Sequence, residues 1–320
     1  MLDIPVTAVE RESKVRAFWA ADALDSASTV GVAWHLSVSQ PELSASVPCD
    51  DEIWQFPESV LAAYPFSSLG APSSFSLFVR LATNELWHVH NHLQQTYDPS
   101  SAEALRKRQS DCDTVYRRLM DWHSDFEQML TLSSPIYTDL FASGGSTTQH
   151  PNSILIHCTV HSAIISLYQR FAASSDLPAE VDGQDSMRRA ADRCLSSCDK
   201  IASVVKGVND AVLESTNPHV IYSVFIAARF SLIYPRIMGL PLPNRLYLLV
   251  YALRVCGHRW ALARQLHLIL EQAMVEISGS WPSQNQLPTE FWDLQYFALD
   301  IHEALRQWLL VSPHARIDST

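Results

Sequence analysis

The chain has 320 residues, of which 47% are hydrophobic and 18% are charged, and its formal net charge at pH 7 is −11. This composition supports a substantial buried core and excludes a mainly disordered protein. Contact with the phosphates of nucleic acids relies on clustered Lys and Arg, so the acidic balance argues against broad nucleic-acid binding by this chain. Nine glycines are present, and they form no phosphate-binding loop, which argues against a nucleotide-binding fold.

Amphipathic helices are predicted along the N-terminal half. The first has Ser13 as its N-cap and a shared face that includes Val15, Phe18, Trp19 and Asp22. After a Pro- and Ser-rich stretch at 57–74, apolar residues recur at steps of three and four, which is typical of a helix with one buried stripe. The members of that stripe are Phe75, Val79, Ala82, Leu86, Val89 and Leu93.

The next helix is predicted to begin with a capping box formed by Ser100 and Glu103 and to end before Pro135. Its apolar stripe consists of Val115, Leu119, Trp122, Phe126 and Met129. A loop at 142–150 is rich in turn residues. It is the best candidate for an internal boundary, although it fits a surface loop within one domain equally well.

Five further helices are predicted in the C-terminal half, and no strand-like alternation is found. The first begins near Pro151 and carries Ile154, Leu155, Cys158, His161, Ile165 and Tyr168. A second spans 187–205, and Asn217-Pro218 is a cap followed by a first-turn proline that starts the next. A long helix is expected at 244–277, and after Pro282 and Pro288 a last helix carries Leu294, Phe297, Ile301, Leu305 and Trp308. The predicted fold class is all-α, a multi-helix domain.

The six cysteines are spread over some two hundred positions, so they do not form a compact metal-binding module. They are Cys49, Cys112, Cys158, Cys194, Cys198 and Cys256. We expect buried, reduced thiols. The apolar region 220–253 is interrupted by arginines and prolines, so a membrane span is not expected there.

Two blocks near the start resemble the regulatory region of a known protein family. Arg16-Ala17-Phe18-Trp19 followed by Asp25 resembles a helix of the form Arg-Arg-x-Phe-Trp with a later Asp, and Pro48-Cys49-Asp50-Asp51 resembles a loop reading Leu-Pro-Cys-Asp-Asp. Both occur in the middle homology region of fungal zinc-cluster (Zn2Cys6) transcription factors. Weaker similarities follow in family order at 152–171, 194–205, 218–233 and in Trp260-x-x-Ala263, so the resemblance spans residues 11–277.

The resemblance implies a regulatory domain at 1–280, truncated at its N-terminus, followed by a C-terminal linker and helix at 281–320. Zinc and DNA contact would belong only to a missing zinc-cluster head. The implied partners are other transcription proteins or a small-molecule effector, with no membrane and a possible homodimer. The implied location is the nucleus, and the implied role is a transcription regulator of a metabolite gene cluster. An effector pocket lined by Trp19, Trp122 or Trp260 fits this role.

Metal-binding alternatives rest on the thirteen histidines. His88 and His92 share a helical face, with His90 between them in sequence, and His157 and His161 form a second i,i+4 pair beside Cys158. No His-Glu-x-x-His motif appears, and no sequence feature brings the two pairs together. A helical metal-binding protein or a small enzyme therefore stays the alternative, and our prediction is no metal site.

Catalytic motifs are weak. Ser197-Cys198-Asp199-Lys200 spells the Ser-x-x-Lys of acyl-transfer enzymes, but the companion Ser-Asp-Asn and Lys-Thr-Gly motifs are absent. Short basic clusters at 106–108, 117–118 and 188–189 indicate solvated helix faces. The acidic loop Asp50-Asp51-Glu52 fits a cap or solvent role better than a cation site. We predict no catalytic residues and no enzyme, and a protein-binding helical scaffold is the third alternative.

Overall fold

The computed structural model describes residues 7–30, 48, 74–98, 101–139, 151–173, 181–279, 286–298 and 300–311. Within these segments the chain forms helices joined by turns, and no described residue lies in a β-strand. The all-α prediction is confirmed. The predicted loop at 142–150 and the acidic loop Asp50-Asp51-Glu52 lie outside the described residues, as do Cys49 and Ser100.

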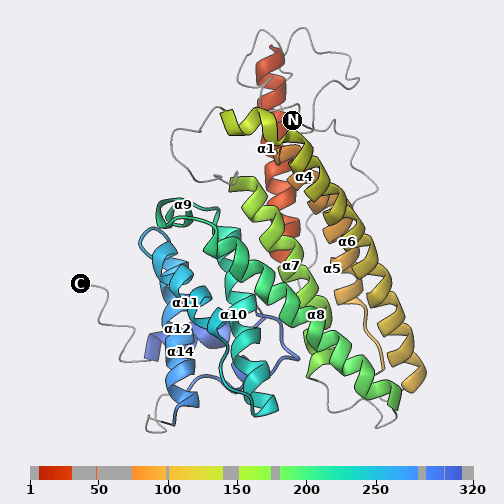
Figure 1. Cartoon of the computed structure of the whole chain (residues 1–320), viewed down its shortest axis with the longest axis vertical. Helices are drawn as coiled ribbons and strands as arrows, with labels where there is room; N and C mark the ends of the chain where they lie inside the picture. Colours follow the sequence, from red (N-terminus) through yellow and green to blue (C-terminus); the bar gives the residue numbers. More distant parts are fainter. Residues whose placement is uncertain are drawn as a thin grey trace.

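The central helices are α7 (Pro151–Ala172), α8 (Val181–Lys206) and α10 (Pro218–Met238). α8 packs along α7, and α10 packs against both of them (Figure 1). Around α7 lie α1 (Ala8–Thr29), α4 (Ser74–Arg80), the π-helical turn η2 (Leu81–Leu86), α5 (Trp87–Gln94) and α6 (Ala102–Asp139). Around α10 lie α9 (Asp210–Glu214), α11 (Asn244–Cys256), α12 (Ala261–Ile277), α13 (Thr289–Trp292) and α14 (His302–Val311).

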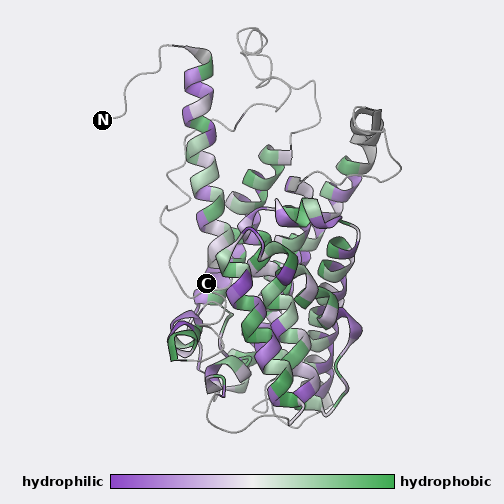
Figure 2. Cartoon of the chain, turned by 90° about the vertical axis from the view of Figure 1, so that its left-hand side faces the viewer, coloured by the Kyte–Doolittle hydropathy of each residue, from purple (hydrophilic) through white to green (hydrophobic). Residues whose placement is uncertain are grey.

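A single hydrophobic cluster connects the helices, from Trp19 in α1 to Leu305 in α14. Figure 2 shows helices that carry both hydrophobic and hydrophilic residues, as expected for elements that bury one face. The N-terminal end of α1 extends beyond the ends of the neighbouring described helices in both views (Figures 1 and 2). The division of the chain at residue 280 stays a prediction.

The predicted apolar stripes are confirmed. Five of the six stripe residues between Phe75 and Leu93 are buried, and Phe75 packs against the core from a half-buried position. Ile154, Leu155, Cys158, His161, Ile165 and Tyr168 of α7 are all buried. The α10 start is also confirmed, because Asn217 caps the helix by accepting from the backbone N–H of His219 at 2.9 Å.

One predicted helix start was wrong. α1 begins six residues earlier than expected, because Thr7 is its N-cap and accepts from the backbone N–H of Glu10 at 3.1 Å. Ser13 lies inside the helix and donates to the carbonyl of Val9. At the start of α6, Ser101 accepts from the N–H of Ala104 at 3.2 Å. The predicted capping box includes Ser100, which lies outside the described residues.

Two other boundaries were also wrong. α6 continues past Pro135 to Asp139. The helix predicted at 244–277 is divided into α11 and α12 near Gly257. An added Cβ on Gly257 would lie 3.3 Å from the Cα of Arg264 in α12, so the glycine permits the close approach of the second helix.

The predicted C-terminal helix is interrupted as well. Leu294 and Phe297 are buried in a turn segment between α13 and α14. The carbonyls of Phe291 and Asp293 accept hydrogen bonds from Arg229, at 2.9 and 2.6 Å. These tertiary bonds replace the backbone bonds that would continue α13.

One π-helical turn, η2, interrupts the second predicted helix. It places Glu85 in a buried position, where Arg118 of α6 donates from Nε to Oε2 at 2.7 Å and from Nη2 to Oε1 at 3.2 Å. Such turns are rare and usually have a specific structural or functional cause. Here the extra residue in the turn accompanies the buried position of Glu85, from which it forms the bidentate ion pair between η2 and α6.

Candidate functional site

The family-like block at the start of the chain lies on α1 and is divided between surface and core. Trp19 is buried, whereas Phe18 is 39% exposed, and the two rings meet edge to face with centroids 5.3 Å apart. Glu12 is buried and pairs with Arg16 at 3.1 Å. The guanidinium of Arg16 also lies over the ring of Phe75 at 5.5 Å. This block therefore anchors α1 to α4.

Of the family-like loop, only Pro48 is described. It is buried, and its carbonyl accepts a hydrogen bond from the hydroxyl of Ser76 in α4 at 3.1 Å. The loop and the α1 block therefore meet the same helix.

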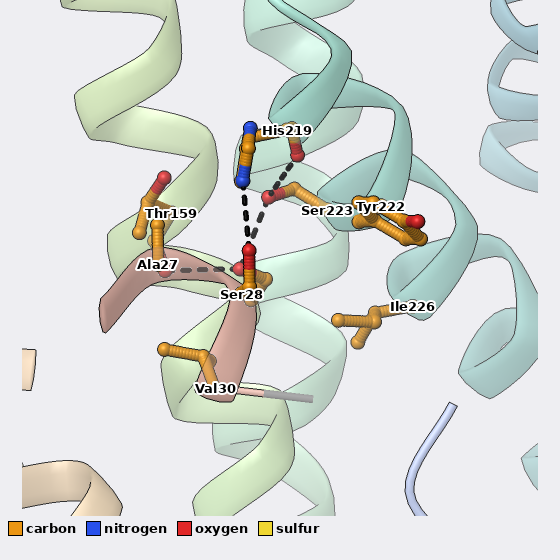
Figure 3. Close-up of a pocket in the computed structure, with 9 residues that line it drawn as sticks. Ala27, Ser28, Val30, Thr159, His219, Tyr222, Ser223 and Ile226 are labelled. Carbon is orange, nitrogen blue, oxygen red and sulfur yellow. Dashed lines mark hydrogen bonds between the residues drawn. The ribbon is translucent and has the colours of Figure 1, made fainter. Parts of the chain in front are cut away.

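A small cavity of about 10 Å³, lined by both polar and apolar side chains, lies between the C-terminal end of α1 and the helices α7 and α10 (Figure 3). It is lined by Ala27, Ser28, Val30, Thr159, Ser162, His219, Tyr222, Ser223 and Ile226. The hydroxyls of Ser162 and Ser223 lie 3.1 Å apart and hydrogen-bond across the α7–α10 contact. A cavity of this size has room for about one water molecule.

Ser28 and His219 join α1 to α10 across this cavity. Ser28 Oγ lies 2.9 Å from His219 Nε2, and His219 Nδ1 lies 3.1 Å from Asn217 Oδ1. Serine, histidine and an amide in this order also occur in activated nucleophiles. The Ser28 hydroxyl has a single proton, however, and it donates its hydrogen bond to the Leu24 carbonyl at 2.8 Å. That proton is therefore directed away from His219. The cavity is too small for a substrate, so the contact serves helix docking.

Burial lowers the pKa of His219, and a hydrogen bond to the Leu24 carbonyl raises it in part. A neutral His219 has one N–H donor and one acceptor nitrogen. It can therefore donate either to Ser28 Oγ or to Asn217 Oδ1, but not to both at once, and it places no charge in the interface.

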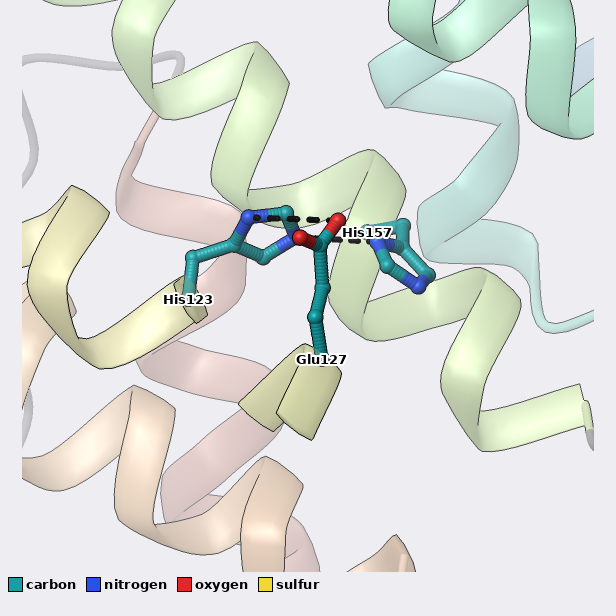
Figure 4. A group of neighbouring side chains, drawn as sticks. All are labelled: His123, Glu127 and His157. Carbon is teal, nitrogen blue, oxygen red and sulfur yellow. Dashed lines mark hydrogen bonds and ion pairs between the residues drawn. The ribbon is translucent and has the colours of Figure 1, made fainter. Parts of the chain in front are cut away.

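A second cluster of polar side chains lies between α6 and α7. His123 Nε2 and His157 Nδ1 are 2.9 Å apart, and Glu127 Oε1 lies 3.9 Å from His123 Nδ1 (Figure 4). The ring of His161, one turn after His157, has its centroid 5.2 Å from that of His123. The i,i+4 pair predicted at His157 and His161 therefore does meet other potential ligands, which the sequence did not reveal.

All three histidines are held in the neutral form. Burial, followed by the neighbouring His123, lowers the pKa of His157 to about 4. Burial lowers the pKa of His161 to about 3, with further contributions from His123, His157 and Lys200. Burial also lowers the pKa of His123, while Glu127 opposes the shift. The cluster is uncharged at neutral pH, apart from Glu127 at its edge.

The other predicted histidine pair has a different environment. His90 and His92 are buried in α5, and His88 is half-buried and meets Trp87 edge to face. Burial lowers the pKa of His92 to about 4, and the nearby Arg108 adds to the effect. Within the described part of the chain, no group of metal-ligating atoms forms around this pair.

The cysteine prediction is confirmed for the five that are described, because each is a buried free thiol. Burial raises the pKa of Cys158 and of Cys198 to about 12, so neither forms a thiolate at neutral pH. In the Ser-x-x-Lys sequence, Ser197 is buried while Lys200 is exposed, and Asp199 pairs with Arg245 at 2.7 Å.

The basic clusters are partly internal. Arg108 is buried, donates to the carbonyl of Gln95 at 2.8 Å and lies over the ring of Tyr97. Arg118 binds Glu85, as described above. Arg106 and Lys107 are exposed, as expected for a solvated face.

The three tryptophans proposed for an effector pocket do not line the cavity. Trp19 is buried in α1, Trp122 stacks on Phe126 with centroids 5.7 Å apart, and Trp260 precedes α12. Their surroundings are those of packed core residues. An effector pocket stays a prediction.

Among the described helices, α10 is long and apolar enough to cross a membrane by length and composition. Of its most apolar window, 78% is buried by the other helices. A core helix passes the same test.

The chain is 24% identical over 305 residues to the notoamide biosynthesis cluster transcriptional coactivator of Aspergillus versicolor. The similarity covers 95% of this chain and 49% of that protein, so the chain spans about half the length of its relative. No known protein-family model matches the sequence, and no solved structure matches it. The similarity supports a fungal regulator of transcription.

Sequence reasoning missed the polar contacts that cross between elements. Ser28 and His219 are 191 positions apart, and neither belongs to a recognisable motif. His123 stands alone in the sequence, and only its i,i+4 spacing to Glu127 gives a local signal. Arg229 is a charged residue within an apolar predicted helix. That position was the one sequence feature that could have indicated its buried structural role.

Proposed function

We propose that this chain is the regulatory part of a fungal transcription regulator that controls a metabolite biosynthesis gene cluster. The observation that carries the proposal is the similarity along nearly the whole chain to a cluster-specific transcriptional coactivator. The all-α fold and the ordered family-like blocks on α1, α7, α8 and α10 support it. The finer proposal is the middle-homology type found in zinc-cluster factors.

Within this proposal the chain acts through proteins and not through direct contact with DNA. The net charge of −11 disfavours contact with phosphates. Two arginines are internal, since Arg229 is 1% exposed and Arg108 is buried, and the exposed Arg118 is paired with the buried carboxylate of Glu85. DNA contact would therefore come from a partner or from a separate zinc-cluster head, and the protein would work in the nucleus.

α1 is the element that we propose to change position when an effector or partner binds. It carries the Phe18-Trp19 pair, and its C-terminal end meets α10 through the polar contact of Ser28 with His219. A polar interface with a small cavity gains less from burial than the apolar α7–α8 contact does. A ligand that prefers one packing of α1 would shift the balance between packings.

The test is a fusion of the chain to a foreign DNA-binding domain upstream of a reporter gene. We expect reporter output to change several-fold relative to the DNA-binding domain alone. Arg306→Gln, which alters an exposed residue paired with Glu303 one turn away on α14, is the matched control and should leave the output unchanged. A fusion that is expressed and folded and yet leaves the reporter at baseline would refute the proposal.

In the host fungus, disruption of the gene should lower transcripts of one co-located set of biosynthetic genes. The purified chain should not shift DNA from their promoters by itself. Transcripts that stay unchanged under producing conditions would contradict the cluster-specific role, even if the reporter responds.

A further inference from the structure

We propose that His123, Glu127 and His157 bind a divalent transition metal ion, with Zn²⁺ the best fit, between α6 and α7. Among the described residues these three are the group whose ligand atoms all lie within 4.8 Å of one another. Two imidazole nitrogens and a carboxylate oxygen are a donor set that suits Zn²⁺. The site does not depend on the proposed role in transcription.

The helices supply the ligands at regular spacing. His123 and Glu127 are one turn apart on α6 and face His157 of α7 (Figure 4). His161 lies one turn after His157 on α7, and its ring is close to that of His123. Two such pairs on adjacent helices are a common way to build a metal site in a helical protein. A bound ion would fasten α6 to α7.

The distances need only small adjustments. Two nitrogens on a tetrahedral Zn²⁺ lie about 3.3 Å apart, given Zn–N bonds of about 2.0–2.1 Å. His123 Nε2 and His157 Nδ1 are 2.9 Å apart, and therefore have to separate slightly. The side chain of Glu127 is 56% exposed, and rotation about its bonds can bring the carboxylate closer. Its exposure also gives an ion a route from solvent.

His161 supports the inference as an available fourth ligand. It is 6% exposed, and its Nδ1 atom has no hydrogen-bond partner in the described part of the chain. A buried polar nitrogen without a partner is costly unless something satisfies it. Its ring is close to that of His123, and a small rotation could complete a four-ligand site.

The protonation state of the histidines favours metal binding, whereas the charge of a nearby lysine opposes it. The histidines are neutral, which is the form that binds metal. Lys200 on α8, however, is near enough to lower the pKa of all three histidines, so it would also repel a bound cation. Removal of that charge should therefore strengthen metal binding. The proposal thus predicts a substitution that raises the affinity for metal as well as substitutions that lower it.

The experiment uses the full chain, stripped with a chelator and titrated with Zn²⁺ by calorimetry. We expect one ion per chain and a rise in Tm of a few degrees when the metal is in excess. Co²⁺, used as a spectroscopic probe, should give absorption bands of a four-coordinate nitrogen–oxygen site. Lys200→Met should bind Zn²⁺ more tightly than the unaltered chain.

Two variants remove ligands with different risks to folding. His157→Gln should abolish stoichiometric binding. Glu127→Gln alters a half-exposed side chain, so it should fold normally and weaken Zn²⁺ binding by about tenfold or more. His258→Gln removes an exposed histidine elsewhere and is the matched control, with binding unchanged.

The alternative is a neutral hydrogen bond between His123 and His157 that has no affinity for metal. The absence of stoichiometric binding by the unaltered chain would establish that alternative. Equal Zn²⁺ affinity in the unaltered chain and Glu127→Gln, together with retained binding in His157→Gln, would place the ion elsewhere and also overturn the proposal.

Discussion

Arg229 Nη2 donates a 2.6 Å hydrogen bond to the backbone carbonyl of Asp293, which ties α10 to the turn that follows α13. The same guanidinium binds three more carbonyls of this segment, those of Glu290, Phe291 and Tyr296. Burial lowers the pKa of Arg229 to about 10, so it stays protonated at neutral pH. One buried cation therefore donates to four carbonyls of this segment, and for the Phe291 carbonyl it supplies the hydrogen bond that no helical N–H provides.

Arg229→Met should lower the free energy of unfolding by about 3–5 kcal/mol, because it removes four hydrogen bonds donated by a buried cation and leaves the Phe291 carbonyl without its donor. Urea denaturation measures this loss. Limited proteolysis should show first cleavage within 286–311, since this segment loses its anchor to α10.

Arg306→Met is the control for that variant. Arg306 pairs with Glu303 on the surface of α14, where such pairs contribute about 0–1 kcal/mol. A loss in Arg229→Met no larger than in Arg306→Met would show that the four carbonyl bonds do not anchor the segment.

Acid should destabilise the protein through His92. Burial lowers its pKa in the folded state to about 4, below the ordinary value of 6.5. The unfolded chain therefore binds more protons between these values, so stability is full above pH 6.5 and is lost as the pH falls towards 4. Over that range the protonation of His92 should lower the free energy of unfolding by about 3 kcal/mol.

Urea denaturation between pH 7 and pH 4 measures this dependence. His92→Gln cannot take up the proton, so its curve of stability against pH should be flatter than that of the unaltered chain. His258→Gln, an exposed histidine, should leave the slope unchanged. Equal slopes in His92→Gln and the unaltered chain would contradict the assignment.

Local periodicity predicted the helices well and their ends poorly. The stripe from Phe75 to Leu93 depends only on residues three and four apart, and the sequence contains that information directly. The break at Leu294 depends on Arg229, more than sixty positions away in the chain, which takes the carbonyls that helix continuation would use. N-caps were misplaced because several serines and threonines near a helix start can act as the N-cap, and the sequence does not show which of them does.

The candidate sites were less predictable than the fold. The histidine cluster needs α6 and α7 to lie side by side in one register, and nothing local to His123 or His157 specifies that register. The contact of Ser28 with His219 likewise exists only after α1 has docked on α10. Residue types and spacing along one helix are visible in the sequence, whereas pairings between helices are set by packing.

Ser28→Ala should weaken the docking of α1. It removes the hydroxyl that bonds to His219 and leaves a buried nitrogen less well satisfied, which costs about 1 kcal/mol. Hydrogen exchange should show faster opening of α1 than of α7. Ser203→Ala, which removes an exposed hydroxyl bonded only to the Asp199 carbonyl, is the control and should change neither quantity. Equal exchange rates in the two variants would rule out a role for Ser28 in docking.

Gly257 and Gly207 offer a matched pair for the break between α11 and α12. A Cβ on Gly257 would lie 3.0 Å from the Arg254 carbonyl oxygen and 3.3 Å from the Arg264 Cα, and both are backbone atoms that cannot move alone. Gly257→Ala should therefore push α12 away and cost about 1–3 kcal/mol. On Gly207 the nearest atom would be 3.5 Å away, an ordinary contact, so Gly207→Ala should be tolerated. Thermal unfolding of both variants measures the difference, and equal Tm values would show that the close approach of α12 does not require a glycine.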